Sequence, residues 1–480
     1  MKKTTKKVIF IEPMAATNVF SHYITIPMLG PVYLATIANE AGIDVSILNE
    51  NILGRKLRSD EIADADILCL SCMTATVERG KEIAWEYKNI RKIRGLESHT
   101  IIGGIHASMI PDDVVNDFDQ VFIGEAETKI VDLLNGELND KIVHGEPLVD
   151  LDSLPTPNFK LIKGWRRIKT LPIMTSRGCP YNCTFCSVTE MFGRGYRNKS
   201  VDRIIDEIIE YNTKQLFFVD DHFVVNKKHT RNLLDKMESN NIKLKWSCQL
   251  RSDVSRDKEL VAIMKARGCK TVFIGFESIN PETLKELKKN QTVEDIRNAV
   301  RVFKRNNIGV HGMFMLGGDK DDKDVFKATS EFCRSSGLSS VQYLILTPLP
   351  GTEFYRRIES EGRLLHKNWQ FYDALHVVFE PKKVSPEELQ QAMIDCFNDF
   401  YTYTSALNDA ISIFFQTIDA LLKSIVKKVN LPSFEPSFIK VFGKHIVKKW
   451  VQFNRPYLGY LRILSLGKGV KLAKETEFSE

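Results

Sequence analysis

Three cysteines lie close together in the stretch RGCPYNCTFC, residues 177–186, and their spacing favours one kind of metal chemistry. Cys179, Cys183 and Cys186 follow a C-x3-C-x2-C pattern, and the next potential metal ligands, His222 and Cys248, are far along the chain. A structural zinc site or an ordinary iron–sulfur cluster is normally completed by four protein ligands. Three thiolates can instead hold three irons of a cubane cluster, which leaves the fourth iron open. The stretch therefore predicts a cluster whose missing ligand is a bound small molecule.

The other cysteines lack the spacing of a ligand set. Cys69 and Cys72 form a C-x-x-C pair, but both fall in a predicted strand, where residues three apart point to opposite faces. We interpret them as buried core thiols. Packing roles are also expected for Cys248, Cys269, Cys333 and Cys396. The N-terminal apolar run is too short for a signal peptide. Nine cysteines in such a chain favour a reducing cytoplasm, where cysteines bind metals or serve catalysis rather than form disulfides.

The composition is that of an ordinary globular protein with two or three domains. The chain has 480 residues, of which 43% are hydrophobic and 27% charged. No stretch reaches the roughly 18 uncharged apolar residues that indicate a transmembrane helix. The net charge of +6 conceals an asymmetry, because residues 423–474 contain 12 Lys and Arg but a single acidic residue.

The first domain, residues 1–145, is predicted to be a doubly wound parallel sheet. Two segments, 30–42 and 76–95, have the pattern of crossover helices. Short apolar runs typical of buried parallel strands lie at 7–13, 44–50, 65–73, 99–107 and 120–127. A ligand crevice is expected at the carboxyl ends of these strands.

A turn-rich linker, residues 146–168, precedes a second α/β domain at 169–385. Strands are expected at 171–177, 215–221, 245–252, 270–278, 309–317 and 340–347, and helices near 200–212, 228–240, 257–267, 292–307, 322–336 and 352–361. Six successive βα units predict a partial (β/α)6 barrel, since a closed barrel of this kind uses eight. The alternation ends there, and residues 386–480 are expected to be helical.

The cysteine stretch resembles the C-x3-C-x-aromatic-C motif of the radical S-adenosylmethionine superfamily, with Phe185 at the aromatic position. The resemblance implies that the three cysteines hold a [4Fe–4S] cluster and that S-adenosylmethionine chelates its open iron. Phe185 would pack beside the adenine. The implied reaction starts with reductive cleavage of S-adenosylmethionine to a 5′-deoxyadenosyl radical. It requires an electron donor such as a reductase, ferredoxin or flavodoxin.

Polar residues end several of the predicted barrel strands. By the same resemblance, they are expected to hold the amine, carboxylate and ribose of S-adenosylmethionine. They are Asp220 and Asp221 after the second strand, Gln249 and Arg251 after the third, and Glu277 after the fourth. The alternative is that each is a turn or cap residue, because short polar side chains often end strands.

The N-terminal sheet ends in LSCMTAT, GGIHAS and GEAE, and no G-x-G-x-x-G dinucleotide fingerprint follows its first strand. Ahead of such a barrel, this set resembles the cobalamin-binding domain of the cobalamin-dependent radical S-adenosylmethionine enzymes. Branches of that family include the anaerobic magnesium-protoporphyrin cyclase, the hopanoid methylases and tetraether lipid synthase. The resemblance implies cobalamin contacts at Ser71, Thr74, Gly103, Gly104, His106, Gly124 and Glu125. Strand-end turn chemistry is the alternative explanation for Ser71, Thr74, Gly103 and Gly104.

One departure from other cobalamin domains sets a further expectation. The D-x-H-x-x-G motif, whose histidine ligates cobalt in methionine-synthase-like domains, does not occur in this chain. Cobalamin is therefore expected to lack a histidine ligand from the protein.

The basic C-terminal region contains two amphipathic segments, 411–429 and 437–453. In the second, an apolar stripe of Phe438, Phe442, Ile446 and Trp450 accompanies a basic stripe of Lys440, Lys444 and Lys448. Three interpretations are open: helices that cap the barrel, an interfacial module on anionic lipid, or a nucleic-acid surface. The long aliphatic faces fit lipid better than a phosphate backbone, so no nucleic-acid partner is expected.

The expected function is cobalamin-dependent methylation of an unactivated carbon in a small molecule or lipid. Lipid is favoured by the amphipathic tail and by the lipid-modifying branches of the family. Radical cyclisation, carbon–carbon coupling or oxidation in lipid or tetrapyrrole biosynthesis are alternatives within the enzyme class. A cobalamin-binding sensor or carrier is the alternative of another class, which the intact cysteine triad disfavours. The expected location is the cytoplasm, with contact at the inner face of the cell membrane if the tail binds lipid.

Overall fold

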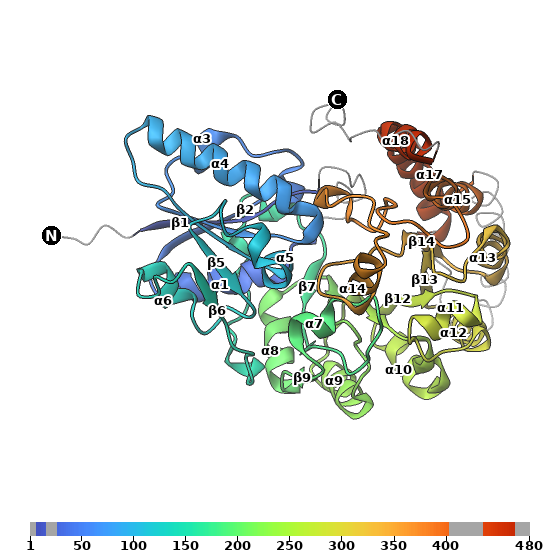
Figure 1. Cartoon of the computed structure of the whole chain (residues 1–480). Helices are drawn as coiled ribbons and strands as arrows, with labels where there is room; N and C mark the ends of the chain where they lie inside the picture. The colour runs from blue at the N-terminus through green and yellow to red at the C-terminus, as the bar shows by residue number, and fades with distance from the viewer. Residues whose placement is uncertain (1–5, 16–25, 403–434, 466–480) are drawn as a thin grey trace. The chain divides into compact units, whose positions relative to one another are not determined.

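The computed structural model describes residues 6–15, 26–402 and 435–465. The chain divides into two compact units. Unit 1 comprises residues 1–249, 266–269 and 347–379, and unit 2 comprises residues 250–265, 270–346 and 380–480. Figure 1 shows the course of the chain from the N-terminal strands in blue to the C-terminal helices in red.

A parallel sheet of six strands forms the first part of unit 1. The strands pair in the order β2-β1-β3-β4-β5-β6. Their bounds are β1 (Lys7–Glu12), β2 (Asp44–Asn49), β3 (Ile67–Ser71), β4 (His99–Gly103), β5 (Gln120–Ile123) and β6 (Ile142–His144). The five predicted strands are confirmed. The sixth, β6, was missed because three residues are too short to show an apolar period.

Helices cover both faces of this sheet, as a doubly wound fold requires. In Figure 1, α3 (Ser59–Ile62) and α4 (Val77–Ile93) lie above the sheet, whereas α1 (Leu29–Glu40) and α6 (Ile130–Asn135) lie below it. Val8 and Phe10 alternate with Ile9 and Ile11 along β1, and all four side chains are buried. Val8 and Phe10 belong to the apolar cluster that includes α1. Burial of the whole strand explains its continuous apolar run.

Two short helices interrupt the expected pattern. The run 99–107 was predicted as one strand, but β4 ends at Gly103 and α5 (Ile105–Met109) follows at once. Gly104 has φ +93°, a backbone conformation that turns the chain out of the strand. The helix α2 (Glu50–Leu53) directly follows β2.

Unit 1 also contains the first three strands of the second α/β region. Strands β7 (Leu171–Ile173), β10 (Gln215–Phe218) and β11 (Lys245–Leu250) pair in parallel in the order β11-β10-β7. The connecting helices are α8 (Val201–Tyr211) and α9 (Lys227–Ser239). The predicted strand 171–177 ends early at Ile173. Residues Ser176–Arg177 form a separate strand, β8, antiparallel to β9 (Arg197–Asn198).

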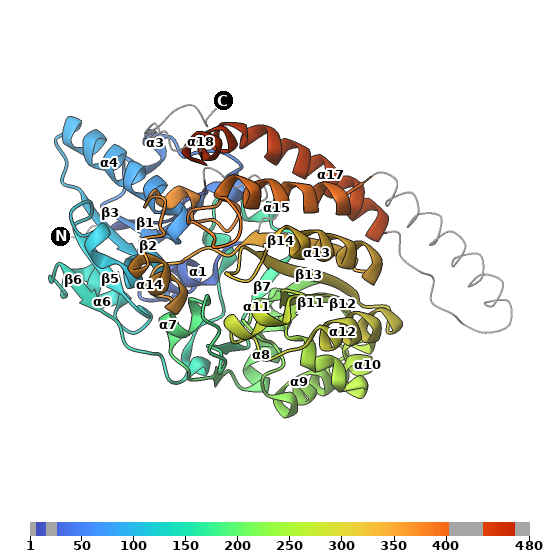
Figure 2. The same ribbon diagram turned by 45° about the vertical axis from the view of Figure 1, so that its right-hand side comes forward.

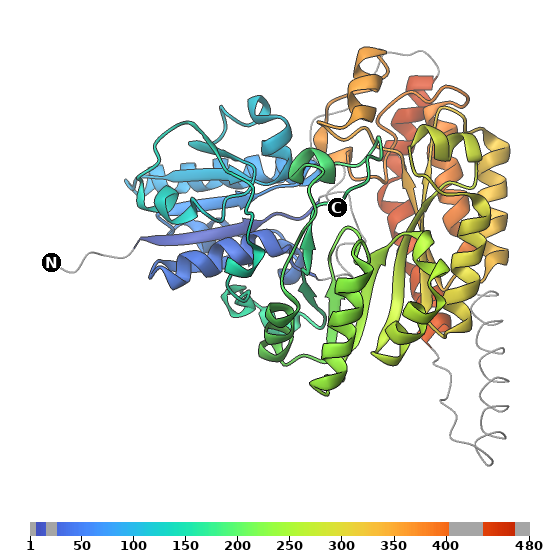
Figure 3. The ribbon, with the colours of Figure 1, turned by 90° about the horizontal axis from the view of Figure 1, so that it is seen from below.

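The later strands of this region belong to unit 2. Strands β12 (Cys269–Glu277), β13 (Gly309–Leu316) and β14 (Ser340–Ile345) pair in parallel in the order β14-β13-β12. Helices α10 (Lys258–Ala266), α11 (Pro281–Glu286), α12 (Val293–Arg305) and α13 (Lys323–Ser336) alternate with them. Figure 3 shows the yellow helices along the outer side of the yellow strands. The expected succession of βα units and the α/β class are confirmed.

The C-terminal helices α15 (Pro386–Phe400), α17 (Glu435–Phe453) and α18 (Arg455–Ser465) pack against one another in unit 2 (Figure 2). Ile446 and Trp450 of the predicted apolar stripe are buried. Of the basic stripe, Lys440 lies over the ring of Phe400 and Lys444 donates to Asn398. Among the described residues, the apolar face of α17 thus packs inside the protein.

The structure describes only part of the two predicted amphipathic segments. Segment 411–429 and the side chains of Phe438 and Phe442 lie outside the described residues. Within the described ranges, no helix is long and apolar enough to cross a membrane.

A buried ion pair joins elements far apart in the sequence of unit 1. Lys199 pairs with Glu207 of α8, and both side chains are fully buried. The Lys199 ammonium also donates to the Tyr33 hydroxyl of α1 at 2.9 Å. Tyr211 donates to the other carboxylate oxygen of Glu207 at 2.6 Å.

Replacing Lys199 by methionine should destabilise unit 1 by about 3–5 kcal/mol, because the Glu207 charge would stay buried without its partner. The K199M/E207M double variant should lose less than the sum of the two single changes, because neither charge remains buried. Urea unfolding followed by tryptophan fluorescence measures both. K236M is the matched control, since Lys236 pairs with Asp202 at an exposed position and should change stability by less than about 1 kcal/mol. A K199M loss no larger than that of K236M would contradict this account.

Candidate active site

The three motif cysteines lie on one loop, between β8 and α7 (Val188–Phe192). All three thiols are partly exposed, whereas the other cysteines of the chain are buried. Cys186 N–H donates to the Cys183 carbonyl at 3.1 Å, which closes a turn. Burial is the main cause that raises the pKa of the Cys186 thiol to about 12, and the charges of Cys183, Asp221 and Cys179 contribute to the same shift. These groups therefore lie close enough to interact, and a bound cationic metal centre would reverse the effect and favour the thiolates.

The backbone of this loop is held at both ends. Gly178 has φ +89°, and a Cβ at this position would lie 2.2 Å from the Gly195 carbonyl oxygen. Only glycine accommodates both the left-handed backbone and the close approach. Further along, Thr184 accepts a backbone hydrogen bond from Phe354 N–H at 2.9 Å.

The donor set suits an iron–sulfur cluster. Thiolates are the soft ligands that such clusters use. Across the parts of the chain that the structure describes, no group of three or more His, Cys, Asp or Glu side chains converges on a single metal-ion position. A cubane requires no such convergence, because each of its irons takes its own thiolate.

The predicted S-adenosylmethionine residues of unit 1 have different surroundings. Asp220 is buried and accepts hydrogen bonds from Thr175 Oγ1 at 2.8 Å and from Ser176 Oγ. Burial raises its pKa, which those hydrogen bonds partly offset. Asp220 thus organises the segment that enters the cysteine loop.

The neighbouring residue Asp221 is open to solvent, and its surroundings still perturb it. Desolvation by the nearby protein and the charge of Asp220 raise its pKa to about 6. Phe185 and Gln249 are half-buried. The Gln249 carbonyl accepts from Phe223 N–H at 2.9 Å.

The two predicted residues of unit 2 are connected by a lysine. Arg251 donates to the Lys289 carbonyl, and the Lys289 ammonium pairs with Glu277 at 2.7 Å. Glu277 has φ +61°, so it occupies a turn conformation at the end of β12. Lys289 was not predicted, because it lies in the loop between α11 and α12 and belongs to no recognisable motif.

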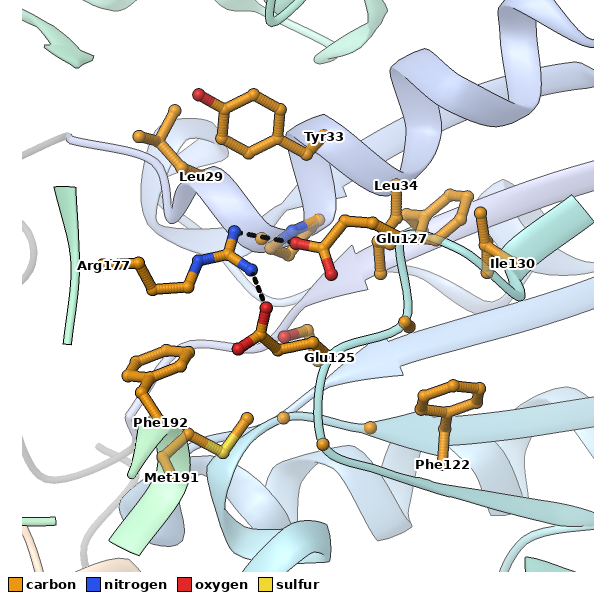
Figure 4. A pocket seen from close by; sticks show the side chains of 18 of the residues that line it. Leu29, Tyr33, Leu34, Phe122, Glu125, Glu127, Ile130, Arg177, Met191 and Phe192 are labelled. Carbon is orange, nitrogen blue, oxygen red and sulfur yellow. Dashed lines mark hydrogen bonds and ion pairs between the residues drawn. The ribbon is translucent and has the colours of Figure 1, made fainter. Parts of the chain in front are cut away.

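A cavity of about 290 Å³ opens in unit 1 at the carboxyl ends of the N-terminal strands. Five of the predicted cobalamin residues line it: Ser71, Gly103, Gly104, Gly124 and Glu125. Its inner part runs between the sheet and helices α1 and α6, where the lining is apolar (Figure 4). At Gly104, a Cβ would lie 2.7 Å from the Cys72 carbonyl oxygen, so the backbone itself forms this part of the wall.

The other two predicted cobalamin residues are not part of the cavity lining. Thr74 is buried in the turn before α4. His106 is fully buried and bonds through Nε2 to Asp113 at 3.1 Å, with Trp369 against its ring. The short helix α5 carries His106 away from the cavity, which sequence periodicity did not indicate.

The opposite wall of the cavity comes from the segments around the cysteine loop. It consists of Met174, Ser176, Arg177, Met191, Phe192, Val219, Asp220 and Asp221. All belong to unit 1. The cavity is therefore bounded both by the N-terminal sheet and by the segments next to the three cysteines.

Two buried arginines and two glutamates link these walls. Arg177, directly before Gly178, pairs with Glu125 at 2.5 Å and with Glu127 at 2.8 Å (Figure 4). Arg197 of β9 pairs with Glu125 at 2.5 Å. Burial alone would raise the pKa of Glu125, but the Arg197 hydrogen bond and the Arg177 charge lower it overall. Arg177, Arg197 and Glu127 were not predicted, because partners 50 or more residues apart leave no local pattern.

Comparisons with known proteins agree with this architecture. Residues 173–333 match the radical SAM superfamily, and residues 19–134 match the B12 binding domain. The chain therefore contains, in the predicted order, a segment that matches a B12 binding domain and a segment that matches the radical SAM superfamily. The resemblance inferred from the motifs is confirmed, and with it the enzyme class and the expected set of [4Fe–4S] cluster, S-adenosylmethionine and cobalamin.

Individual relatives are distant but cover most of the chain. Bacteriochlorophyllide d C-12(1)-methyltransferase from Chlorobaculum tepidum is 25% identical and aligns with 83% of this chain and 88% of its own length. Hopanoid C-2 methylase from Rhodopseudomonas palustris is 27% identical and aligns with 67% of this chain and 62% of its own length. The solved structure of the cobalamin-dependent S-adenosylmethionine radical enzyme OxsB covers 99% of this chain and 83% of its own, with a TM-score of 0.66 and 14% identity. That likeness supports the fold.

Replacing Cys183 by alanine should abolish the visible absorbance of a reconstituted cluster, because only two of the three thiolates would remain. Iron and sulfide content after anaerobic reconstitution provide the second measurement. C248A is the control, since Cys248 is a buried packing residue and its removal should leave cluster content unchanged. Equal cluster content in C183A and wild type would exclude Cys183 as a ligand.

Replacing Gly178 by alanine should lower the free energy of unfolding by at least about 1–2 kcal/mol, the cost of a left-handed backbone in a residue with a side chain. The contact with Gly195 should add to this loss and reduce cluster content. G195A is a closely matched control, because a Cβ there meets nothing within 4 Å. Denaturant unfolding and iron content measure both variants, and equal behaviour of the two would contradict the proposed constraint.

Proposed function

We propose that this enzyme transfers a methyl group to an unactivated carbon by radical chemistry. The observation that carries the proposal is the cavity in unit 1. Its lining includes residues of the segment that matches the B12 binding domain and residues of the segment that matches the radical SAM superfamily. Methyltransferases among the relatives support the same reaction type.

We propose the following roles for the residues around the cysteine loop. Cys179, Cys183 and Cys186 bind three irons of the cluster, and Phe185 packs beside the adenine of S-adenosylmethionine. Asp221, Gln249, Arg251 and Glu277 contact its polar groups, while Asp220 holds the loop through Thr175 and Ser176. The bound cluster and S-adenosylmethionine supply a 5′-deoxyadenosyl radical when an external reductase, ferredoxin or flavodoxin delivers an electron.

For cobalamin we propose the cavity and the strand ends around it. The inner, apolar part is small for a ligand of this size, so it would enclose one portion of the cofactor. Ser71, Gly103, Gly104 and Gly124 would bring backbone close to the remainder. Bound cobalamin supplies a transferable methyl group. The domain limits we propose are 1–145 for cobalamin, 146–168 for the linker, 169–385 for the barrel and 386–480 for the helical region.

The favoured substrate class is a lipid, for which two observations provide support. One relative is a hopanoid methylase. Exposed cations on α17 and α18, among them Lys448, Lys449 and Arg455, could attract anionic headgroups. Because the apolar face of α17 is packed inside the protein, contact with a membrane surface would be electrostatic rather than by insertion. We propose a cytoplasmic enzyme that touches the inner membrane face.

A tetrapyrrole is the second candidate substrate. The bacteriochlorophyllide methyltransferase aligns with a larger share of this chain than the hopanoid methylase does. Methylation, cyclisation, coupling and oxidation all begin with hydrogen abstraction, so one assay can compare substrate classes before the product is known.

The reconstituted enzyme should transfer deuterium from its substrate into 5′-deoxyadenosine under reducing, anaerobic conditions. Deuterium-labelled membrane lipids and labelled tetrapyrroles would be supplied in parallel, and mass spectrometry would score both 5′-deoxyadenosine and methylated product. C186A is the control and should form no 5′-deoxyadenosine. Absence of 5′-deoxyadenosine from cluster-loaded wild type would remove the enzyme proposal in favour of a cobalamin sensor or carrier. Label transfer without a methylated product would indicate cyclisation, coupling or oxidation instead.

A further inference from the structure

One carboxylate oxygen in the cavity wall has no partner in the described part of the chain. Glu127 uses Oε1 to accept from Arg177 at 2.8 Å, while its Oε2 is buried and makes no hydrogen bond. The Glu127 side chain is only 8% exposed and belongs to the cavity lining. Figure 4 shows a single dashed line at Glu127, to Arg177. A buried acceptor of this kind requires a donor.

The other acceptors of the cluster are already occupied. Glu125 Oε1 accepts from Arg197 at 2.5 Å. Glu125 Oε2 accepts from Arg177 at 2.5 Å, from Arg197 at 3.0 Å and from the backbone N–H of Leu148 at 2.9 Å. Only Glu127 Oε2 therefore remains for a ligand among these four oxygens.

The charge balance indicates what kind of donor fits. Two glutamates face two arginines, so the cluster is neutral as it stands. A cationic ligand would add an unbalanced charge in a buried place, which is costly. A neutral N–H or O–H donor satisfies Oε2 without that cost. The periphery of the corrin ring of cobalamin carries several primary amides, which are neutral N–H donors.

We propose that Glu127 Oε2 accepts a hydrogen bond from one of the propionamides at the corrin periphery of cobalamin. This inference rests on the proposed function, because it requires cobalamin in this cavity. It assigns a binding role to a residue outside the sequence-predicted site.

The same carboxylate also reaches the cysteine loop. Through Oε1 it holds Arg177, which directly precedes Gly178 and Cys179. A ligand on Oε2 and the ion pair on Oε1 therefore share one side chain. Cobalamin binding and the placement of Arg177 are linked through it, and such a linkage acts equally in both directions.

The test uses cobalamin and its three monocarboxylic acids, in each of which one propionamide is hydrolysed to a carboxylate. Binding to full-length, cluster-loaded protein is measured by equilibrium dialysis and cobalamin absorbance. Wild type should bind one of the acids about tenfold or more weakly than cobalamin, because two carboxylates would then face each other without a proton between them. E127Q should bind cobalamin about tenfold more weakly than wild type, since a charge-assisted hydrogen bond is lost. It should bind that same acid about as well as it binds cobalamin, because the glutamine amide can donate to the new carboxylate.

E125Q is the matched control. It disturbs the same ion-pair cluster but removes no free acceptor, so it should change the affinity for cobalamin and for all three acids by a common factor. Should E127Q fail to accumulate as folded protein, E127D serves instead. The carboxylate of E127D is shorter by one methylene, so this variant should bind cobalamin more weakly than wild type does. Because it keeps a negative charge, its affinity for the monocarboxylic acid should stay below its affinity for cobalamin.

Two results would overturn the inference. If E127Q lowers the affinity for cobalamin and all three acids equally, as E125Q does, Glu127 acts only through the ion-pair cluster. If E127Q binds every ligand as wild type does, Oε2 contacts no part of cobalamin. Failure of wild-type protein to bind cobalamin at all would instead overturn the proposed function and, with it, this inference.

Discussion

The buried ion-pair cluster of Arg177, Arg197, Glu125 and Glu127 is the interaction on which the site in unit 1 depends. Desolvating four charged groups is expensive, and the cost is offset only where geometry and additional hydrogen bonds are favourable. Here each arginine reaches Glu125, and the Leu148 backbone adds a further donor. The cluster joins the loop after β5 to Arg177, the first residue of the cysteine stretch. Losing one partner would leave the others charged and buried, which is costly. The ion pairs therefore strongly favour one placement of Arg177 relative to the loop after β5.

The same ion pairs fix the position at which the cysteine loop begins. Arg177 is held by its side chain, and Gly178 is held by the close approach of the Gly195 carbonyl. Asp220 adds a third restraint through Thr175 and Ser176. The three cysteines thus project from a loop whose backbone conformation is restricted by these contacts. A preorganised metal site requires such restriction. The cluster that they are proposed to bind would complete this arrangement.

Several residues expected to contact ligands are engaged by the protein itself. Glu125 accepts from two arginines, Asp220 from a threonine and a serine, and Glu277 from Lys289. Both oxygens of Glu125 are used in this way, whereas Glu127 holds Arg177 with one oxygen and keeps the other without a protein partner in the cavity wall. A carboxylate after a strand can therefore support a loop and still leave an acceptor for a ligand.

The sequence by itself determined the elements, the order of the two α/β regions and the identity of the cysteine motif. Strand and helix periods and the C-x3-C-x2-C spacing are local properties, so they can be read within a window of a few residues. Errors were also local: β6 was too short to show a period, and the φ +93° turn at Gly104 ended β4 before the predicted limit. Only the tertiary structure decided which side chains share the cavity. Arg177 meets Glu125 from 52 residues away, and α5 takes His106 out of the lining. Such contacts depend on where whole elements pack, and long-range packing leaves no periodic signal along the chain.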